Sequence, residues 1–391
     1  MLAFSIAALG LGCKDSPTAN GSGHEASATG RSLPQRLGPS RGQVRYVAPW
    51  GSNSNPGTRG RPWRTIQRAL DTLRPGQRAL VRKGIYTQSL VMSRAGTATA
   101  PITIRAYPGE RPVIHPGGSG SMDYPVRITA GAAYFRLAGF IVEGARLHTT
   151  MNVWISDGQR QSGPPPTHHI EISACEIRAG TGTGVFVSPN TQAVQVIGNA
   201  VHDNGDGSRQ HQGIYFQGQG GLIANNLVYH QTNGFGIQVR GNFPDEDTTR
   251  EIPARDVIVT NNTVVDNSLS GILVENSASD VLVVNNISAL NGTHGVVGYD
   301  NGSGGVLAGN LAYNNLLWGN SDGPFGNSDR SVVDFSRGNI VANPRFVNAQ
   351  RRNYRLGAGS PAANRALPAF APPFDRTGRR RPKPDLGAYE R

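Results

Sequence analysis

Three side chains in the middle of the chain carry groups that suit proton transfer and charge stabilisation. They are the imidazole of His211, the phenol of Tyr215 and the guanidinium of Arg240. An imidazole or a phenol can accept a proton, and a guanidinium can hold the negative charge that develops beside it. Such groups could serve a β-elimination on a uronic acid, in which a proton leaves the carbon next to the carboxylate and a glycosidic oxygen departs.

Acidic residues near these three suggest two other kinds of site. The candidate metal ligands are Asp203, Asp206, Asp245, Glu246 and Asp247. Such carboxylates could bind calcium, although the Asp-Glu-Asp run is equally typical of a solvated loop. Alternatively, Glu275 with Asp203 or Asp247 could form the carboxylate pair of a glycoside hydrolase, which in inverting enzymes are about 6.5–9.5 Å apart.

A repeat of short strands must position these residues. Five asparagines recur at spacings of 27, 36, 24 and 24 residues: Asn199, Asn226, Asn262, Asn286 and Asn310. A period near 24 with alternating strands and no helix between them predicts a solenoid of stacked β-coils. A β-propeller and a two-sheet sandwich are the alternatives, but propeller blades repeat at about 40–50 residues and sandwiches have no asparagine at a fixed period. We therefore expect a parallel β-helix in which the asparagines form a ladder across coils.

Alternation within each strand predicts which side chains face outward. Trp154, Phe186 and Tyr215 should stand above one another on successive coils, about 4.8 Å apart. Such a row can hold sugar rings, or it can stabilise the coils under a covering loop at 157–167. Further substrate contacts are expected from Gln217, Gln238, His202, His230 and Glu275.

The sequence divides into four parts. We expect a signal peptide at 1–13, a flexible linker at 14–42, the β-helix at 43–365 and a C-terminal tail at 366–391 that packs on it or caps it. A short amphipathic helix at 63–73 would cover the first coil, because an open end strand invites pairing with another chain.

The first thirteen residues, MLAFSIAALGLGC, form an apolar run that ends in a cysteine. The pattern predicts export, with Cys13 as a site of lipid attachment at the cell envelope. A plain signal peptide with a coincidental cysteine is the alternative, and the protein would then be secreted. The run is too short to span a membrane, so a membrane contact would come only through Cys13.

The chain is strongly basic, with 38 basic and 26 acidic residues and a net charge of +12. A basic protein suits an anionic partner. The charge is not concentrated in a basic helix or interleaved with aromatic residues, so we expect an acidic polysaccharide rather than nucleic acid. We also expect a monomer.

Both ends of the predicted β-helix resemble a known family. The segments YVAPWGSNSNPGTRGRPWRTIQRALDTLRPGQRALVRKGIYTQ, GTATAPITIRAYPGERPVI and SPAANRALPAFAPPFDRTGRRRPKPDLGAYER resemble bacterial proteins with PbH1 repeats related to family 9 pectate lyases. The resemblance covers about residues 43–391. It implies an all-β fold, a single-stranded right-handed parallel β-helix with a short N-terminal capping α-helix.

The resemblance also implies a lysine as the catalytic base and a calcium ion held by several aspartates. No lysine lies between Lys83 and Lys383, so the chain departs from that pattern in its central coils. We therefore expect an exported carbohydrate-active protein that acts on an acidic polysaccharide by β-elimination, with calcium as the candidate cofactor. A non-catalytic polysaccharide-binding protein and a glycoside hydrolase are the alternatives.

Overall fold

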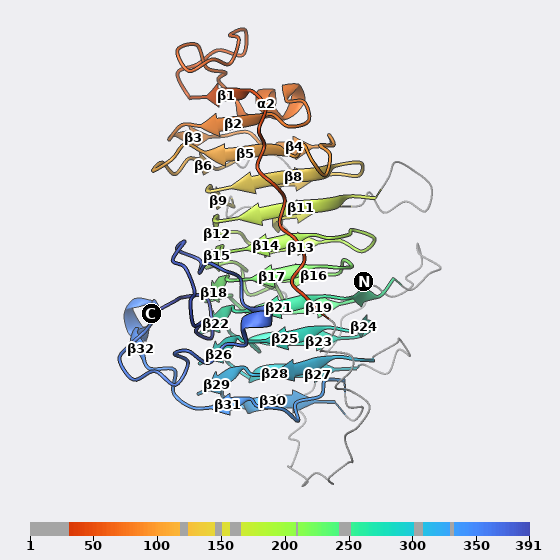
Figure 1. Ribbon diagram of the computed structural model, residues 1–391, viewed down its shortest axis with the longest axis vertical. Coiled ribbons are helices and arrows are strands. Elements are labelled where there is room, and N and C mark those ends of the chain that lie inside the picture. Colours follow the sequence, from red (N-terminus) through yellow and green to blue (C-terminus); the bar gives the residue numbers. More distant parts are fainter. Residues whose placement is uncertain are drawn as a thin grey trace. The chain divides into compact units, whose positions relative to one another are not determined.

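A computed structural model shows the fold of most of the chain. It describes residues 31–117, 124–144, 151–156, 166–208, 210–241, 252–300, 308–328 and 332–391. Residues Ser32–Arg391 form one compact unit. Three long parallel sheets run through this unit, and successive coils of the chain contribute neighbouring strands to each of them (Figure 1).

The strands fall into these sheets in the order in which they pair. The first sheet contains β1 (Val44–Val47), β2 (Arg78–Val81), β5 (Ile102–Ala106), β8 (Ala133–Ala138), β11 (His168–Ser173), β14 (Gln195–Ile197), β17 (Leu222–Ala224), β21 (Ile258–Thr260), β25 (Leu282–Val284) and β28 (Leu311–Tyr313). The second contains β4 (Leu90–Met92), β7 (Val126–Ile128), β10 (Met151–Ile155), β13 (Thr183–Val187), β16 (Ile214–Phe216), β19 (Ile237–Arg240), β23 (Ile272–Glu275), β27 (His294–Tyr299) and β30 (Gly323–Asn327). The third contains β3 (Ile85–Tyr86), β6 (Val113–Ile114), β9 (Ile141–Glu143), β12 (Glu176–Arg178), β15 (Ala200–His202), β18 (Leu227–Tyr229), β22 (Thr263–Val265), β26 (Ile287–Ala289), β29 (Leu316–Trp318) and β31 (Ile340–Val341).

A few short elements complete the unit. They are α2 (Ile66–Thr72), the paired strands β20 (Ala254–Arg255) and β24 (Ala278–Ser279), the antiparallel pair β32 (Phe346–Asn348) and β33 (Asn353–Leu356), and the 3-10 turns η1 (Ala349–Arg351) and η2 (Pro368–Phe370). The predicted right-handed parallel β-helix is confirmed. Among the described residues, no helix is long and apolar enough to cross a membrane.

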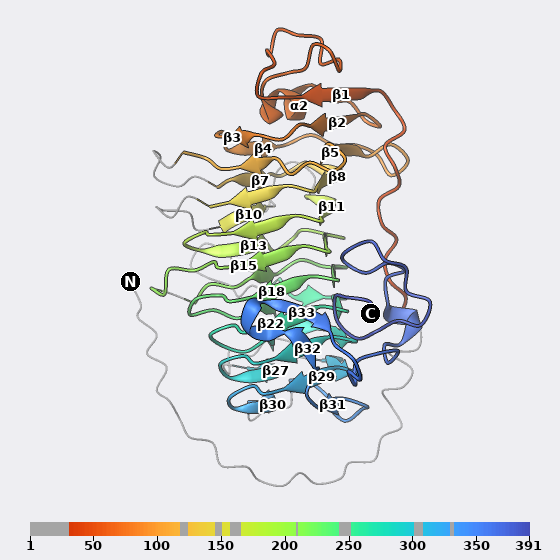
Figure 2. The same cartoon turned by 90° about the vertical axis from the view of Figure 1, so that its left-hand side faces the viewer.

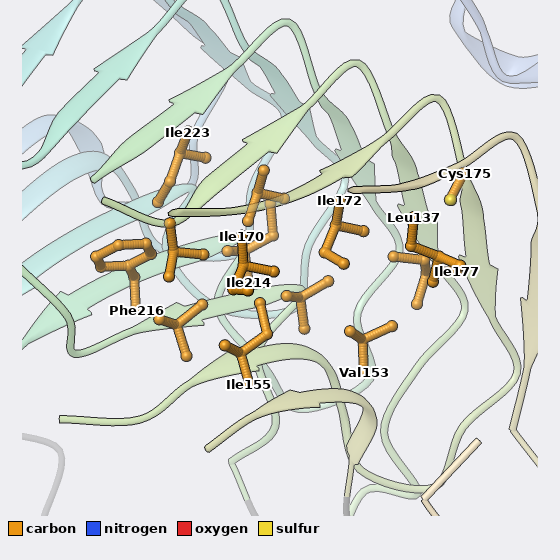
Figure 3. Close-up of a cluster of buried hydrophobic side chains, with 14 of the residues drawn as sticks. Leu137, Val153, Ile155, Ile170, Ile172, Cys175, Ile177, Ile214, Phe216 and Ile223 are labelled. Atoms are coloured by element: carbon orange, nitrogen blue, oxygen red, sulfur yellow. The ribbon is translucent and has the colours of Figure 1, made fainter. Parts of the chain in front are cut away.

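The core lies inside the coils, where strands of all three sheets point their apolar residues toward one another. In the second sheet, the predicted inner row is fully buried: Val185, Ile214, Ile237, Ile272 and Val296. Figure 3 shows side chains from neighbouring coils in this interior, with Phe216 and Cys175 among them. Because equivalent residues of successive coils pair in register, the outward residues of each sheet also form rows that run from coil to coil.

Asparagine side chains form the predicted ladder at a buried corner between the first and third sheets. Each Nδ2 group donates to the next Oδ1 atom over 3.0 Å in the pairs Asn199–Asn226, Asn226–Asn262 and Asn262–Asn286. The prediction of Asn310 as the next member is wrong. Asn286 donates to Asn315 over 3.0 Å, because this coil is 29 residues long and not 24. Asn310 instead accepts from the Val281 N–H at another turn.

The predicted cap is formed by α2. Thr65 caps its N-terminus by accepting from the backbone N–H of Arg68, and Ile66, Ala69 and Leu70 are buried. The helix contacts both β1 and β4, so its apolar face covers the start of the solenoid.

The segment Ser32–Arg41, which we name the N-terminal strap, lies along the first sheet (Figure 1). Arg36 forms an ion pair with Glu171, which has no exposed side-chain surface. The side chain of Gln195 donates to the Gln35 carbonyl at 2.9 Å, and Ser40 donates to the Pro101 carbonyl at 2.6 Å. The expectation of a flexible linker therefore does not hold for this stretch.

The last fifty residues, 342–391, which we name the C-terminal segment, pack on the third sheet (Figure 2). Their buried contacts form a second apolar cluster, in which Tyr354 and Leu386 lie with Tyr229 and Ile287 of the third sheet. The packed tail thus begins earlier in the chain than the expected residue 366.

Candidate active site on the second sheet

The outer face of the second sheet carries the predicted aromatic row. Trp154 pairs in register with Phe186, and Phe186 pairs with Tyr215. The rings of Phe186 and Tyr215 have centroids 5.1 Å apart and are tilted by 42°. All three aromatic residues are half-buried, so the row is not a bare flat strip.

Two residues that the repeat pattern did not single out extend the row. The ring of Tyr124 lies 4.7 Å from that of Trp154, and the Arg127 guanidinium lies 4.5 Å from the Trp154 ring centroid. Arg127 pairs with Trp154 in register and could have been found by extending the row one coil toward the N-terminus. Tyr124 lies outside any strand, so strand alternation does not indicate it.

A polar cluster follows the aromatic row on the next coils. Tyr215 and Gln217 come from β16 and the residue after it, Gln238 and Arg240 from β19, and Glu275 from β23. The Gln217 amide donates to the Tyr215 hydroxyl at 3.2 Å, and the Gln238 amide donates to Glu275 Oε1 at 3.0 Å. Arg240 Nε lies 3.2 Å from the same oxygen of Glu275. Five of the predicted site residues are therefore neighbours, as we expected.

Burial controls the protonation of two members of this cluster. It raises the pKa of Tyr215 to about 12, with the Arg240 charge acting in the opposite direction. Burial also raises the pKa of Glu275, against the opposing effects of Arg240 and the Gln238 hydrogen bond. Tyr215 is thus a neutral phenol at neutral pH, and Glu275 is a stronger base than an exposed glutamate.

Glu275 is the one carboxylate among the described outward residues of the second-sheet strands from β7 to β27. Paired-carboxylate hydrolysis needs a second acid across the substrate. Asp247, one predicted partner of Glu275, lies outside the described residues. A phenol, a guanidinium and a carboxylate provide a proton donor, a cationic site and a base, which are the three functions that β-elimination requires.

His211 lies in the turn between β15 and β16. Its Nε2 atom is 3.6 Å from Asp206 Oδ1, and that oxygen also accepts from the Ser208 backbone at 2.9 Å. The imidazole thus sits on a turn that leads into the strand of Tyr215, four residues before it.

His202, Asp203 and His230 lie on the third sheet or at its edge, and not beside the aromatic row as predicted. Asp203 accepts from His202 at 2.7 Å, from Arg352 at 2.9 Å and from His230. The His202 ring stacks on Tyr229 with centroids 4.6 Å apart. Strand alternation predicts only that a side chain faces outward. The strands β15 and β18 belong to the third sheet, so their outward residues lie on a different face from Tyr215 of the second sheet.

The structure also corrects the proposed role of Asp203 in calcium binding. Burial alone would raise its pKa, but the hydrogen bonds from His202, His230 and Arg352 outweigh this effect and lower the pKa to about 2. A carboxylate whose oxygens are held by these donors does not fit a calcium ion, which needs several free oxygen ligands. Within the described residues, no group of three or more His, Cys, Asp or Glu side chains is placed to hold a metal.

Four predicted residues lie outside the described ranges. These are Asp245, Glu246 and Asp247 of the acidic insertion and Cys13 of the N-terminal run. Among the described residues that sequence reasoning missed, Arg352 joins the cluster around Asp203 from a part of the chain that lies outside the repeat.

Comparisons with known proteins agree with this architecture. The family described as "Pel9A-like, right handed beta helix region" matches residues 45–221, and "Right handed beta helix region" matches residues 194–346. The crystal structure of pectate lyase Pel9A superposes with a TM-score of 0.61 at 19% identity, covering 91% of this chain and 98% of that one.

Two curated proteins share a shorter segment with this chain. The uncharacterised protein YwoF of Bacillus subtilis is 38% identical over 73 residues, which are 19% of this chain and 16% of that protein. Pectate lyase PEL9 of Emericella nidulans is 39% identical over 71 residues, which are 18% of this chain and 17% of that protein. The matches therefore span about a sixth of each relative. The chain is a right-handed parallel β-helix protein related to the family 9 pectate lyases.

Proposed function

We propose that this protein binds an acidic polysaccharide on the outer face of the second sheet and cleaves it by β-elimination. The observation that carries the proposal is the contact cluster of Tyr215, Arg240 and Glu275. Relatedness to pectate lyases supports the reaction class, and the net charge of +12 supports an anionic substrate.

Each group has a role in the proposed reaction. Arg240 binds the uronate carboxylate and stabilises the enolate-like charge. Glu275 accepts the proton from the carbon next to that carboxylate. Tyr215 donates its proton to the departing glycosidic oxygen, a role that suits a phenol whose pKa is raised to about 12 and whose oxygen already accepts from Gln217. A carbon–carbon double bond forms as the carbon–oxygen bond breaks.

His211 is the other candidate base, and its position on the turn before β16 supports that role less directly than the contacts of Glu275 do. The two assignments predict different pH profiles. With Glu275 as base, the rate rises through the raised pKa of a carboxyl group, and Glu275→Gln abolishes turnover. With His211 as base, the rate rises through about pH 6.5 and His211→Ala is the inactive variant.

The reaction class can be tested by measuring two products from the same digests. Polygalacturonate, alginate and glycosaminoglycans would be incubated with the protein, with and without calcium. Elimination produces both unsaturated ends and reducing ends, whereas hydrolysis produces only reducing ends. Binding without either product would show that the protein binds polysaccharide without cleaving it. The absence of lysine between Lys83 and Lys383 favours this alternative.

We also propose that the protein acts outside the cytoplasm, tethered at the cell envelope through a lipid on Cys13. The apolar run that ends at Cys13 supports this proposal. Cys13→Ser would release the protein from the membrane fraction. Equal membrane recovery of the variant and the parent would rule out the lipid anchor.

A further inference from the structure

The C-terminal segment carries most of the net charge of the chain. Residues 342–391 contain eleven basic and three acidic residues, a net of +8 out of +12. The exposed basic residues are Arg345, Arg351, Arg352, Arg355, Arg365, Arg379, Arg380, Lys383 and Arg391. The three acids Asp375, Asp385 and Glu390 are all buried. The exposed charged side chains of this segment are therefore all basic.

The buried acids are used to fold the segment and do not neutralise its surface. Asp375 Oδ1 accepts from the backbone N–H groups of Thr377 and Arg379 at 2.8 and 2.9 Å, and its other oxygen accepts from the N–H of Glu390. The Glu390 carboxylate is 3.1 Å from Arg381, which is itself buried. Apart from Arg352, which pairs with Asp203, the exposed arginines are available to bind an external anion.

Several of these side chains converge on the turn 374–380. Phe374 and Arg380 are partners in an antiparallel bridge, and the Phe374 side chain is 53% exposed. The guanidinium groups of Arg355 and Arg376 lie 4.9 and 5.4 Å from the ring centroid of Tyr389. We name Phe374, Arg355, Arg376, Arg379 and Arg380 the arginine patch.

A cavity of about 700 Å³ opens beside this patch, between the turn and the N-terminal strap. Its apolar lining includes Leu33, Pro34, Ile197, Leu222 and Phe374. Arg36 and Arg376 also line it. Its volume is within the range of about 300–1,000 Å³ that is typical of ligand sites. The strands that border it, β11, β14 and β17, belong to the first sheet, so this cavity is separate from the candidate site on the second sheet.

We propose that the arginine patch and this cavity form a second binding site for a carboxylated polysaccharide. A sugar ring lies against Phe374 and the apolar lining, and the carboxylates of the polymer bind Arg376, Arg379 and Arg380. Arginine suits this role because its planar fork matches a carboxylate with two hydrogen bonds. The exposed Phe374 ring, which lines the cavity together with Arg376, distinguishes the patch from a merely solvated basic surface.

The choice of a polysaccharide as the ligand rests on the proposed function. The inference that an anion binds here rests on the arginine patch alone. Holding a long chain at a second site raises its effective concentration at the first. The patch therefore increases affinity for long polymers and has no effect on the cleavage of fragments too short to reach it.

The test compares Phe374→Ala, Arg380→Gln and their double variant with the parent, using sodium polygalacturonate and sodium alginate as probes. Trp50→Ala with Arg61→Gln is the matched control, because both residues are exposed and lie near the N-terminal cap. Binding is measured by titration calorimetry at low and moderate salt, and thermal denaturation checks that each variant is folded. Single-stranded DNA and polyphosphate are the competing anions.

We expect the double variant to bind the long uronate polymer about five- to tenfold more weakly, from loss of one aromatic contact and one charge contact, and the control to bind as the parent does. Unchanged affinity of the folded double variant, or no binding of either polymer by the parent, overturns the proposal. Equal or tighter binding of DNA or polyphosphate assigns the patch to another polyanion and overturns the choice of polysaccharide. If the polymers bind through the patch but none is cleaved, the patch stands and the proposed function fails.

Discussion

Asn262→Ala tests the asparagine ladder that fixes the register of the coils. Asn262 is fully buried, and its side chain makes four hydrogen bonds: it donates to Ile223 O and Asn286 Oδ1, and it accepts from the backbone and the side chain of Asn226. Alanine removes all four. The side-chain amide of Asn226 keeps its bond to the Val196 carbonyl at 2.8 Å, but the backbone N–H of Asn226 loses its acceptor.

The expected loss of stability follows from these contacts. An orphaned buried N–H costs about 1–3 kcal/mol, and each remaining bond that is lost contributes about 0.5–1.5 kcal/mol net. Together these terms come to about 2.5–7.5 kcal/mol, so we expect the free energy of unfolding to fall by at least about 3 kcal/mol. Asn353→Ala, at an exposed residue of β33, is the matched control and should change stability by no more than about 0.5 kcal/mol.

Two measurements follow the effect. Guanidinium denaturation measures the loss of global stability. Hydrogen exchange by mass spectrometry measures the exchange rate of the Asn226 backbone N–H, which should be faster in the Asn262→Ala variant. A variant with the parent's denaturation midpoint and the parent's exchange rate at Asn226 would refute the ladder as a source of stability.

Three further predictions concern the outer faces of the sheets. Trp154→Ala with Phe186→Ala should weaken binding of acidic oligosaccharides about tenfold while the protein remains folded, and unchanged affinity in a folded double variant would show that the row only stabilises the coils. Asp203 has a folded pKa of about 2, below its ordinary 3.8, so its stabilising effect is present above pH 3.8 and is lost as the pH falls toward 2. Asp203→Asn should remove this acid sensitivity and expose the 346–356 hairpin to proteolysis at neutral pH. Burial raises the folded pKa of Glu275 above 4.5, so the free energy of unfolding should fall as the pH rises from 4.5 through the raised value, and a Glu275→Gln variant with the same pH dependence as the parent would contradict this.

The repeat allowed the fold and the polar cluster of Tyr215, Arg240 and Glu275 to be predicted from sequence, but not the cluster around Asp203. Alternation after each glycine placed Tyr215 next to Phe186 and Arg240 next to Glu275, because register in a stacked solenoid follows directly from equivalent positions in successive coils. The same reasoning failed for Asn310, since one coil is five residues longer than the period and the asparagine at the predicted spacing falls on a different turn.

Other features have no signal in the repeat. His202 faces outward, but the sequence does not show which sheet of the coil a short strand joins, so its distance from Tyr215 could not be inferred. Arg352 and the cationic surface of the C-terminal segment are brought to the third sheet by tertiary packing. A second ladder, in which Asn204, Gln231 and Asn267 follow one another at another turn, was missed because a glutamine interrupts the asparagines.

The most direct test of the central claim is the rate of unsaturated product formation from the preferred uronate polymer by the parent, Arg240→Gln and the control Arg255→Gln, which replaces an exposed arginine. If Arg240 stabilises the charge that develops on the uronate, Arg240→Gln should reduce the rate by about a hundredfold or more while the protein remains folded, and Arg255→Gln should react as the parent does. A folded Arg240→Gln variant that forms unsaturated product at the parent's rate would contradict the assignment of the site to the outer face of the second sheet.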